Sequence, residues 1–125
     1  MLFMASKIIS VSFSKEFNEE YLAIKNIVEM EVNKGLLNSQ NHQLLTKIDK
    51  TIEILKTKPD YGIAIPKNII PKELIKEYGI NNLRKVNLSH AWRLCYTLKT
   101  DSVEIVSILL NVMDHKKYNK LFGYK

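Results

Sequence analysis

The stretch from Leu83 to Met113 limits the fold of this chain most strongly, because it contains three strand-like runs separated by short turns. Apolar and polar residues alternate in the first two runs, 83–88 and 92–98, as they do in half-buried strands. The third run, 103–113, is almost continuously apolar, which indicates a central strand covered on at least part of both faces. The pattern therefore predicts three consecutive strands that meander.

The first half of the chain is predicted to hold one strand and two helices. Residues 7–13 alternate like a half-buried strand. Apolar residues recur every three or four positions from Lys15 to Asn33, and again from Asn38 or Ser39 to Lys56, which is typical of amphipathic helices. The short connection predicts an antiparallel hairpin. Its apolar stripes are interpreted as core that packs against a sheet; a partner-binding surface is the alternative.

Proline and glycine interrupt the chain between the helices and the three strands. Residues 62–67 are predicted to form a loop or a short edge strand, and Lys72 to Tyr78 a short helix. The predicted fold is α+β: an N-terminal strand and an antiparallel helical hairpin packed on a small, largely antiparallel sheet of about four strands, in the order β-α-α-β-β-β. Because 125 residues show no linker or repeat, we expect a single domain spanning residues 1–125.

The composition is that of an ordinary globular protein, and no apolar run approaches the roughly 20 residues of a membrane helix. The N-terminal residues Met1 to Ala5 are too short an apolar run for a signal peptide, and Met4 is an alternative start. The lone Cys95 cannot form an internal disulfide, which fits a cytoplasmic setting, and is interpreted as a small core residue.

The net charge of +6 is placed entirely in the second half of the chain. Residues 1–60 hold eight lysines and eight acidic residues, whereas residues 61–125 hold eleven basic residues and five acidic ones. Such an asymmetry suggests a polyanion or an acidic protein as the partner of the second half. The alternative is a basic face that is merely solvated.

Arg93 is a charge inside an otherwise apolar predicted strand. Because it faces away from Trp92 and Leu94, it lies beside Lys85 if the hairpin forms. Two cations on neighbouring strands repel each other, but they can hold a phosphate between them, and arginine binds phosphate through two parallel hydrogen bonds. The alternative is a solvent-facing arginine with an acidic neighbour.

A polar cluster, Asp114-His115-Lys116-Lys117-Tyr118, follows the last predicted strand directly. His115 is able to move a proton near neutral pH, Lys116 to hold or protonate a phosphate oxygen, and Tyr118 to stack on a base. The alternative is a solvated C-terminal turn.

The remaining histidines give no sign of a metal site. His42 is predicted on a helix surface and His90 in a turn. The sequence has no Cys/His metal pattern and no glycine-rich phosphate loop, so we expect neither a metal nor a nucleotide cofactor.

The order of elements, the strand Trp92-Arg93-Leu94-Cys95-Tyr96 and the terminal cluster 114–118 resemble the RelE/ParE superfamily of type II toxins, which includes HigB-like members. The resemblance covers most of the chain, and its core runs from Leu83 to Phe122. The insertion from Ile63 to Tyr78 looks like that of archaeal members and departs from the compact bacterial pattern.

The resemblance implies a RelE-like fold and a metal-independent mRNA endonuclease that acts on the ribosome and inhibits translation. In family nucleases the ribose 2′-OH attacks the neighbouring phosphate and leaves a cyclic phosphate end. The protein then supplies position, charge stabilisation and proton transfer.

By motif position, Arg93 would stabilise the phosphorane, and His115 or Lys116 would be the acid or base. Tyr118 would orient a base. The chain has Asn87 where family nucleases often carry a second basic residue, and lysine at 116 where some carry arginine, whose fork lysine lacks. The basic residues expected to contact RNA are Lys67, Arg84, Lys85 and Lys117.

Two other functions stay open at this point. One is a toxin that acts by binding, as ParE-type members do on DNA gyrase, generally without the catalytic set. The other is a degenerate, non-catalytic module that binds RNA or protein. The joint presence of Arg93, His115 and Tyr118 favours the nuclease. Its expected partners are mRNA, the ribosome and a small acidic or amphipathic antitoxin; a homodimer is also consistent with the resemblance.

Overall fold

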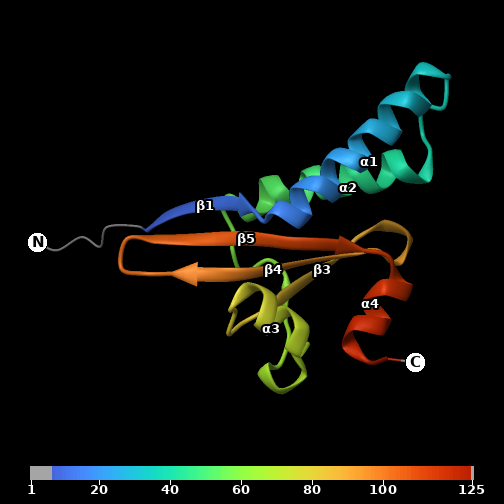
Figure 1. Cartoon of the computed structure of the whole chain (residues 1–125). Coiled ribbons are helices and arrows are strands. Elements are labelled where there is room, and N and C mark those ends of the chain that lie inside the picture. Colours follow the sequence, from blue (N-terminus) through green and yellow to red (C-terminus); the bar gives the residue numbers. More distant parts are fainter. Residues whose placement is uncertain (1–6, 125) are drawn as a thin grey trace, which may run out of the picture.

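The computed structural model describes residues 7–124, so the N-terminal residues Met1 to Ala5 considered above lie outside it. One five-stranded sheet, in the order β1-β5-β4-β3-β2, runs through the molecule (Figure 1). Helices cover both of its faces, α1 and α2 on one and α3 and α4 on the other. The elements are β1 (Ile8–Phe13), α1 (Lys15–Asn33), α2 (Gln40–Leu55), β2 (Ile63–Ala64), η1 (Lys67–Ile69), α3 (Lys72–Tyr78), β3 (Arg84–Asn87), η2 (Ser89–Ala91), β4 (Arg93–Thr100), β5 (Glu104–Met113) and α4 (His115–Phe122).

This arrangement confirms the predicted α+β class, the helical hairpin and the three consecutive C-terminal strands. The sheet is mixed: β1 pairs with β5 in parallel, and every other pairing is antiparallel. Strand β5 lies between β1 and β4, which explains its nearly continuous apolar sequence. The segment predicted as a loop or edge strand forms the two-residue edge strand β2.

The α1–α2 hairpin packs one larger core against the sheet, and its far end extends beyond the strands (Figure 1). Both helices begin at a serine cap: Ser14 Oγ accepts from the Phe17 N–H at 3.0 Å, and Ser39 Oγ from the His42 N–H at 3.0 Å. The buried members of this core are Phe17, Ile24, Val28, Leu44, Ile48, Ile52, Leu55, Val86, Leu88, Leu94, Tyr96, Leu109 and Val112.

A second, smaller core lies on the opposite face, under α3 and α4. Helix α4 is a difference from the sequence analysis, which treated residues 114–118 only as a polar cluster or turn. Asp114 caps this helix by accepting from the Lys117 N–H at 2.8 Å, and Gly123 ends it in the left-handed conformation. The buried members are Ile65, Ile70, Leu74, Ile80, Leu83, Cys95, Leu110, Met113 and Tyr118.

The loop before β2 is fastened to the sheet by Tyr96. The tyrosine hydroxyl donates to the Pro59 carbonyl at 2.8 Å and accepts from the Gly62 N–H at 2.8 Å. Glycine is required here because a Cβ atom at Gly62 would lie 2.7 Å from the Tyr96 ring and 2.9 Å from the Lys85 carbonyl. Tyr96 therefore holds the loop close to β3.

Candidate functional site

Arg93 and Lys85 converge on the α3–α4 face of the sheet. In the β3–β4 pairing Lys85 opposes Cys95, and Arg93 opposes Asn87, so the two cations are diagonal neighbours on one face. Both lie over the ring of Tyr118: the Lys85 Nζ is 5.4 Å from the ring centroid and the Arg93 Cζ is 5.5 Å from it. The expected juxtaposition of Lys85 and Arg93 is thus confirmed. We call Lys85 and Arg93 the cation pair and the Tyr118 ring its platform.

The cation pair has no counter-charge among residues 7–124. The two ion pairs found in this range are Lys56–Glu53 and Lys117–Glu20. The Arg93 guanidinium donates one hydrogen bond, to the Trp92 carbonyl at 3.2 Å, and its buried Nε has no acceptor. Like charges held together without a carboxylate are costly unless an anion is bound. The cation pair is therefore suited to bind an anion.

The structure corrects the role expected for Tyr118. The residue is only 4% exposed, and its ring stacks on Phe122 with a centroid distance of 4.3 Å. Burial raises the pKa of Tyr118 to about 12, with smaller contributions in the same direction from the nearby Cys95 and Tyr124. The phenol therefore stays neutral. A ring covered in this way cannot stack on a base. It instead positions the two cations through cation–π contact.

Cys95 lies beneath the cation pair and is fully buried, which confirms its interpretation as a core residue. Burial raises the pKa of its thiol to about 12, although Lys85 and Arg93 act in the opposite direction. The thiol therefore stays protonated and is not a nucleophile at neutral pH.

The polar cluster 114–118 forms the start of helix α4, so its members lie on different faces of that helix. His115 is exposed and opens the helix two residues after Met113, the strand partner of Arg93. It lies three residues before Tyr118, so the two share a helix face. Lys116 lies two residues before Tyr118, which places it on the opposite face. His115 and Lys116 are both exposed in the first turn of α4, and their role in proton transfer stays a prediction.

Lys117 and Glu20 form a separate group that the sequence analysis missed. The Lys117 Nζ is 3.8 Å from Glu20 Oε2, and Glu20 Oε1 accepts from the Val112 N–H at 3.0 Å. Burial raises the pKa of Glu20, while the Val112 hydrogen bond acts in the opposite direction. Glu20 thus supplies a hydrogen-bond acceptor to the backbone of β5 at a point beyond the end of β1, where no strand neighbour is present on that edge among the described residues. Because α1 and β5 are far apart in sequence, no local signal could have revealed this contact.

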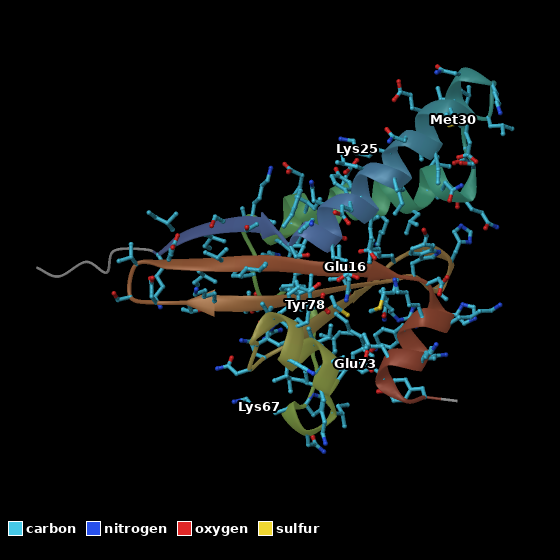
Figure 2. The ribbon with its side chains drawn as sticks, viewed as in Figure 1. Glu16, Lys25, Met30, Lys67, Glu73 and Tyr78 are labelled. Atoms are coloured by element: carbon cyan, nitrogen blue, oxygen red, sulfur yellow. The ribbon has the colours of Figure 1, made fainter. Side chains whose placement is uncertain are left out.

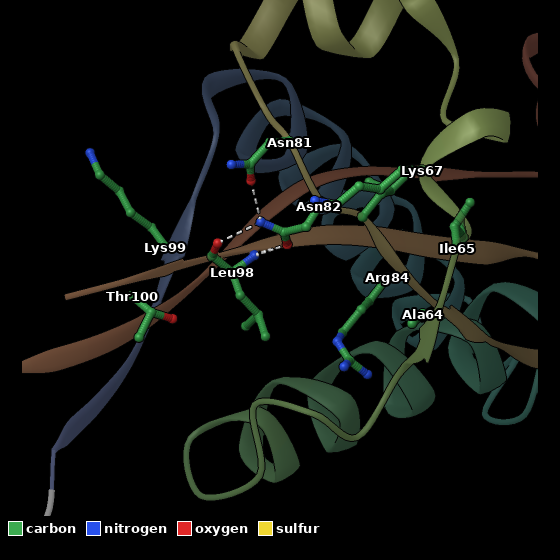
Figure 3. A pocket seen from close by; sticks show the side chains of 10 residues that line it. Ala64, Ile65, Lys67, Asn81, Asn82, Arg84, Leu98, Lys99 and Thr100 are labelled. Atoms are coloured by element: carbon green, nitrogen blue, oxygen red, sulfur yellow. Dashed lines mark hydrogen bonds between the residues drawn. The ribbon is translucent and has the colours of Figure 1, made fainter. Parts of the chain in front are cut away.

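Lys67 and Arg84 lie away from the cation pair, around a hollow at the other end of β3. Figure 3 shows this hollow, which has a volume of about 550 Å³, with Lys99 on its third side. The predicted RNA-contacting residues are therefore distributed over three places: Lys85 in the cation pair, Lys117 beside Glu20, and Lys67 and Arg84 at the hollow.

Outside α4, His90 has a hydrogen-bond partner, whereas the buried Nδ1 of His42 has none among residues 7–124. His90 lies in the turn η2, as predicted, with φ 55° and its Nε2 2.9 Å from Gln43 Oε1. His42 is half-buried near the start of α2, deeper than the predicted surface position. Within residues 7–124, no three His, Cys, Asp or Glu side chains gather as a metal-ligand group. No helix in that range is long and apolar enough to cross a membrane.

Comparisons with known proteins agree with the fold. No protein-family model matches the sequence, and no curated protein matches it. Among solved structures, the chain is similar to a chain of the chromosomal ParDE TA system from P. aeruginosa, with a TM-score of 0.53 and 13% sequence identity. The match covers 87% of this chain and 98% of that chain. At this identity the likeness extends to the fold, and it confirms the RelE/ParE-like architecture expected from the sequence.

Proposed function

We propose that this protein is the toxin component of a type II toxin–antitoxin system and a metal-independent mRNA endonuclease that acts on the ribosome. One observation carries the proposal: Lys85 and Arg93 converge on a buried ring with no carboxylate partner among residues 7–124. A phosphate between them would relieve the repulsion and satisfy the guanidinium. The sequence resemblance and the fold shared with a ParDE TA chain support the same class.

In the proposed reaction the ribose 2′-oxygen attacks the adjacent phosphorus and loses its proton. The bond from phosphorus to the 5′-oxygen breaks, and that oxygen takes up a proton, which leaves a 2′,3′-cyclic phosphate and a 5′-hydroxyl. Arg93 stabilises the negative charge of the phosphorane, and Lys85 holds a phosphate oxygen. His115, exposed at the start of α4, accepts the proton of the 2′-hydroxyl, and water donates a proton to the departing 5′-oxygen. Lys116, two residues before Tyr118 on α4, is the weaker candidate for the base because the two side chains lie on opposite faces of the helix.

A small antitoxin would neutralise such a toxin by covering its basic face. The excess of positive charge in residues 61–125 favours an acidic segment as the covering element. Burial of the cation pair by that segment would block RNA at the same place.

The alternative is a toxin that acts by binding, as ParE-type members do. The specific observation that favours it is the fold neighbour, a ParDE TA chain, together with Asn87 in place of a basic residue beside Arg93. In that case Arg93 would contact a partner, and no phosphodiester bond would break.

The two functions are separated by induced expression with mapping of new mRNA 5′ ends. We expect growth arrest and codon-phased cuts for the wild type, and a loss of cutting of roughly 100-fold or more for Arg93→Ala, the size seen when a transition-state donor is removed. The control is Lys50→Ala, an exposed residue on α2, which should cut normally. Growth arrest without cuts would support the binding toxin. Equal cutting by Arg93→Ala and wild type would overturn the site.

A further inference from the structure

The hollow beside the start of β3 is basic on three sides. Lys67 comes from η1, Arg84 from β3 and Lys99 from the end of β4, and all three contribute to the lining, although Figure 3 shows the Lys99 side chain extending away from the other two. The other lining residues are neutral: Ala64, Ile65, Asn81, Asn82, Leu83, Leu98 and Thr100. A space of about 550 Å³ is within the range that accommodates small ligands and nucleotides.

These three cations also lack carboxylate partners among residues 7–124. Arg84 uses one nitrogen to donate to the Gly62 carbonyl at 2.7 Å and the Asp60 carbonyl at 3.2 Å, which fixes its guanidinium but leaves its charge uncompensated. The Asp101 carboxylate accepts from the Glu104 and Val103 N–H groups, which together with the nearby Lys99 lower its pKa, so Asp101 offsets part of the charge of Lys99. The hollow is therefore a site of positive potential.

The walls of the hollow are held in place by Asn82. Its side chain donates to the Leu98 carbonyl at 2.9 Å and accepts from the Leu98 N–H at 2.9 Å, so it replaces a strand neighbour where β4 runs past the end of β3. Thr97 Oγ1 donates to the Asn82 carbonyl at 2.7 Å. A site formed before its ligand arrives loses less entropy on binding.

A smaller depression of about 250 Å³ lies along β2 and β3 and includes Lys85 of the cation pair in its lining. It is lined by Tyr61 and Ile63 on one side and by Lys85 and Asn87 on the other. Tyr61 is 42% exposed, unlike the buried Tyr118. The basic hollow, the exposed ring and the cation pair all adjoin β2 and β3, but alternation along β3 turns Arg84 to the α1–α2 face and Lys85 to the α3–α4 face. A strand of RNA that contacts both would therefore cross the sheet edge at β2. Arg93 and Lys99 are six residues apart on one extended strand, or roughly 20 Å.

We propose that Lys67, Arg84 and Lys99 form a second phosphate-binding subsite for single-stranded RNA, and that Tyr61 stacks on a base between this subsite and the cation pair. The roughly 20 Å span is long enough for a segment of several nucleotides, which is the size of site that single-strand-binding folds use. The inference rests on the proposal that this face binds RNA, but it does not require that RNA be cut.

A nucleic acid fits this surface better than an acidic peptide. The cations are spread along an edge with apolar surface and an exposed ring between them, whereas an acidic peptide has no flat aromatic bases for Tyr61 to stack on. Nucleic acids combine regularly spaced phosphates with such bases.

The test is fluorescence anisotropy of the full chain with a twelve-nucleotide 2′-O-methyl RNA, which cannot be cut because it lacks the 2′-hydroxyl nucleophile. We expect the double variant Lys67→Ser/Lys99→Ser to weaken RNA binding roughly tenfold or more. It should also reduce the slope of log affinity against log salt concentration by about 1.4, because each lost phosphate contact contributes about 0.7 to that slope. The matched control is Lys34→Ser with Lys50→Ser, which removes equal charge from the hairpin and should change the affinity by less than about twofold. Tyr61→Ala should weaken binding about tenfold, and Tyr61→Phe should restore it.

Equal losses in the test and control pairs would overturn the inference, because they would show attraction by net charge alone. Displacement of the RNA by polyglutamate as readily as by unlabelled RNA of equal charge would overturn it in favour of an acidic protein partner. Binding that depends on the hollow in a wild type that cuts no mRNA would refute the nuclease and leave this subsite standing.

Discussion

The two faces of the sheet differ in how their polar groups are matched. On the α1–α2 face, several polar side chains at the rim of the core are paired, since the Tyr21 hydroxyl donates to Asp49 and Ser39 donates to Glu31 at 2.7 Å, although the buried Nδ1 of His42 has no partner in the part of the chain that the structure describes. On the α3–α4 face, Lys85 and Arg93 share one ring without a carboxylate partner among residues 7–124. Figure 2 shows Lys25 and Met30 far out on the hairpin, whereas Tyr78 and Lys67 lie beneath the sheet.

This difference separates stability from binding. Matched polar groups and the larger apolar core make the first face a scaffold. Unmatched cations reduce stability, and proteins keep such arrangements where function requires them. We therefore expect changes on the first face to alter the free energy of unfolding, and changes at the cation pair to alter anion binding.

The largest effect on stability is expected from Ile48→Ala, because Ile48 is fully buried in the first core. The lost apolar contact and the cavity left behind should lower the free energy of unfolding by about 2–5 kcal/mol, measured by urea denaturation. The counterpart on the other face, Arg93→Ala, should change it by less than about 1 kcal/mol. Similar losses of unfolding free energy for both variants would show that the two faces do not differ in their contribution to stability.

The next effect is expected from Gly62→Ala, which tests the fastening of the loop that carries Tyr61. A Cβ atom 2.7 Å from the Tyr96 ring forces ring or loop to move, at a cost of about 1–3 kcal/mol in the free energy of unfolding. Thermal denaturation measures this loss. RNA affinity should fall with it, because Tyr61 and Arg84 both depend on the loop. Unchanged stability would show that the loop is not rigid.

Asp114→Ala should remove the cap of α4 and cost about 1 kcal/mol. Because α4 carries His115 and Tyr118, we expect faster amide hydrogen exchange in α4 and reduced mRNA cutting. Ser39→Ala is the control on the other face, since it removes the cap of α2 together with the hydrogen bond from Ser39 to Glu31. It should cost a similar free energy and leave cutting unchanged. A loss of mRNA cutting with Ser39→Ala would contradict the assignment of stability to the α1–α2 face and of RNA binding to the α3–α4 face.

The smallest effect is expected from Glu20→Gln. Because burial raises the pKa of Glu20 in the folded state, its contribution to stability is greatest below the unfolded pKa of about 4.5 and is lost as pH rises through the folded pKa. The amide oxygen of the substituted side chain would still accept from the Val112 N–H. Relative to the wild type, the free energy of unfolding of the variant should therefore rise by about 0.5 kcal/mol or less between pH 4 and pH 7, after allowance for solvent screening. Denaturation at the two pH values measures this. A relative loss at pH 7 would show that the contact with Lys117 outweighs burial.

Periodicity predicted the scaffold because its signals are local. The helix from Lys15 to Asn33 and the strand faces of Trp92 and Arg93 follow from spacing alone. Helix α4 escaped prediction because its first turn consists of charged and polar residues, and its apolar face depends on Tyr118 and Phe122.

The candidate site could be predicted only in part. The proximity of Lys85 and Arg93 follows from alternation within one hairpin. The burial of Tyr118, the contact of Glu20 with β5 and the basic hollow all depend on elements that meet only in three dimensions. The hollow in particular combines Lys67 from the insertion with Lys99 from the far end of β4.

The most direct measurement follows the side-chain Nε–H signals of arginine by NMR during titration with the uncuttable RNA. The chain has only two arginines, Arg93 in the cation pair and Arg84 at the hollow, so the spectrum holds two such signals, and Arg84→Lys assigns them. We predict that both signals shift on binding while the backbone amides of α1 and α2 stay in place. A shift of Arg93 alone would refute the second subsite. Shifts confined to α1 and α2, with Arg93 unchanged, would contradict the central claim that the α3–α4 face grips phosphate.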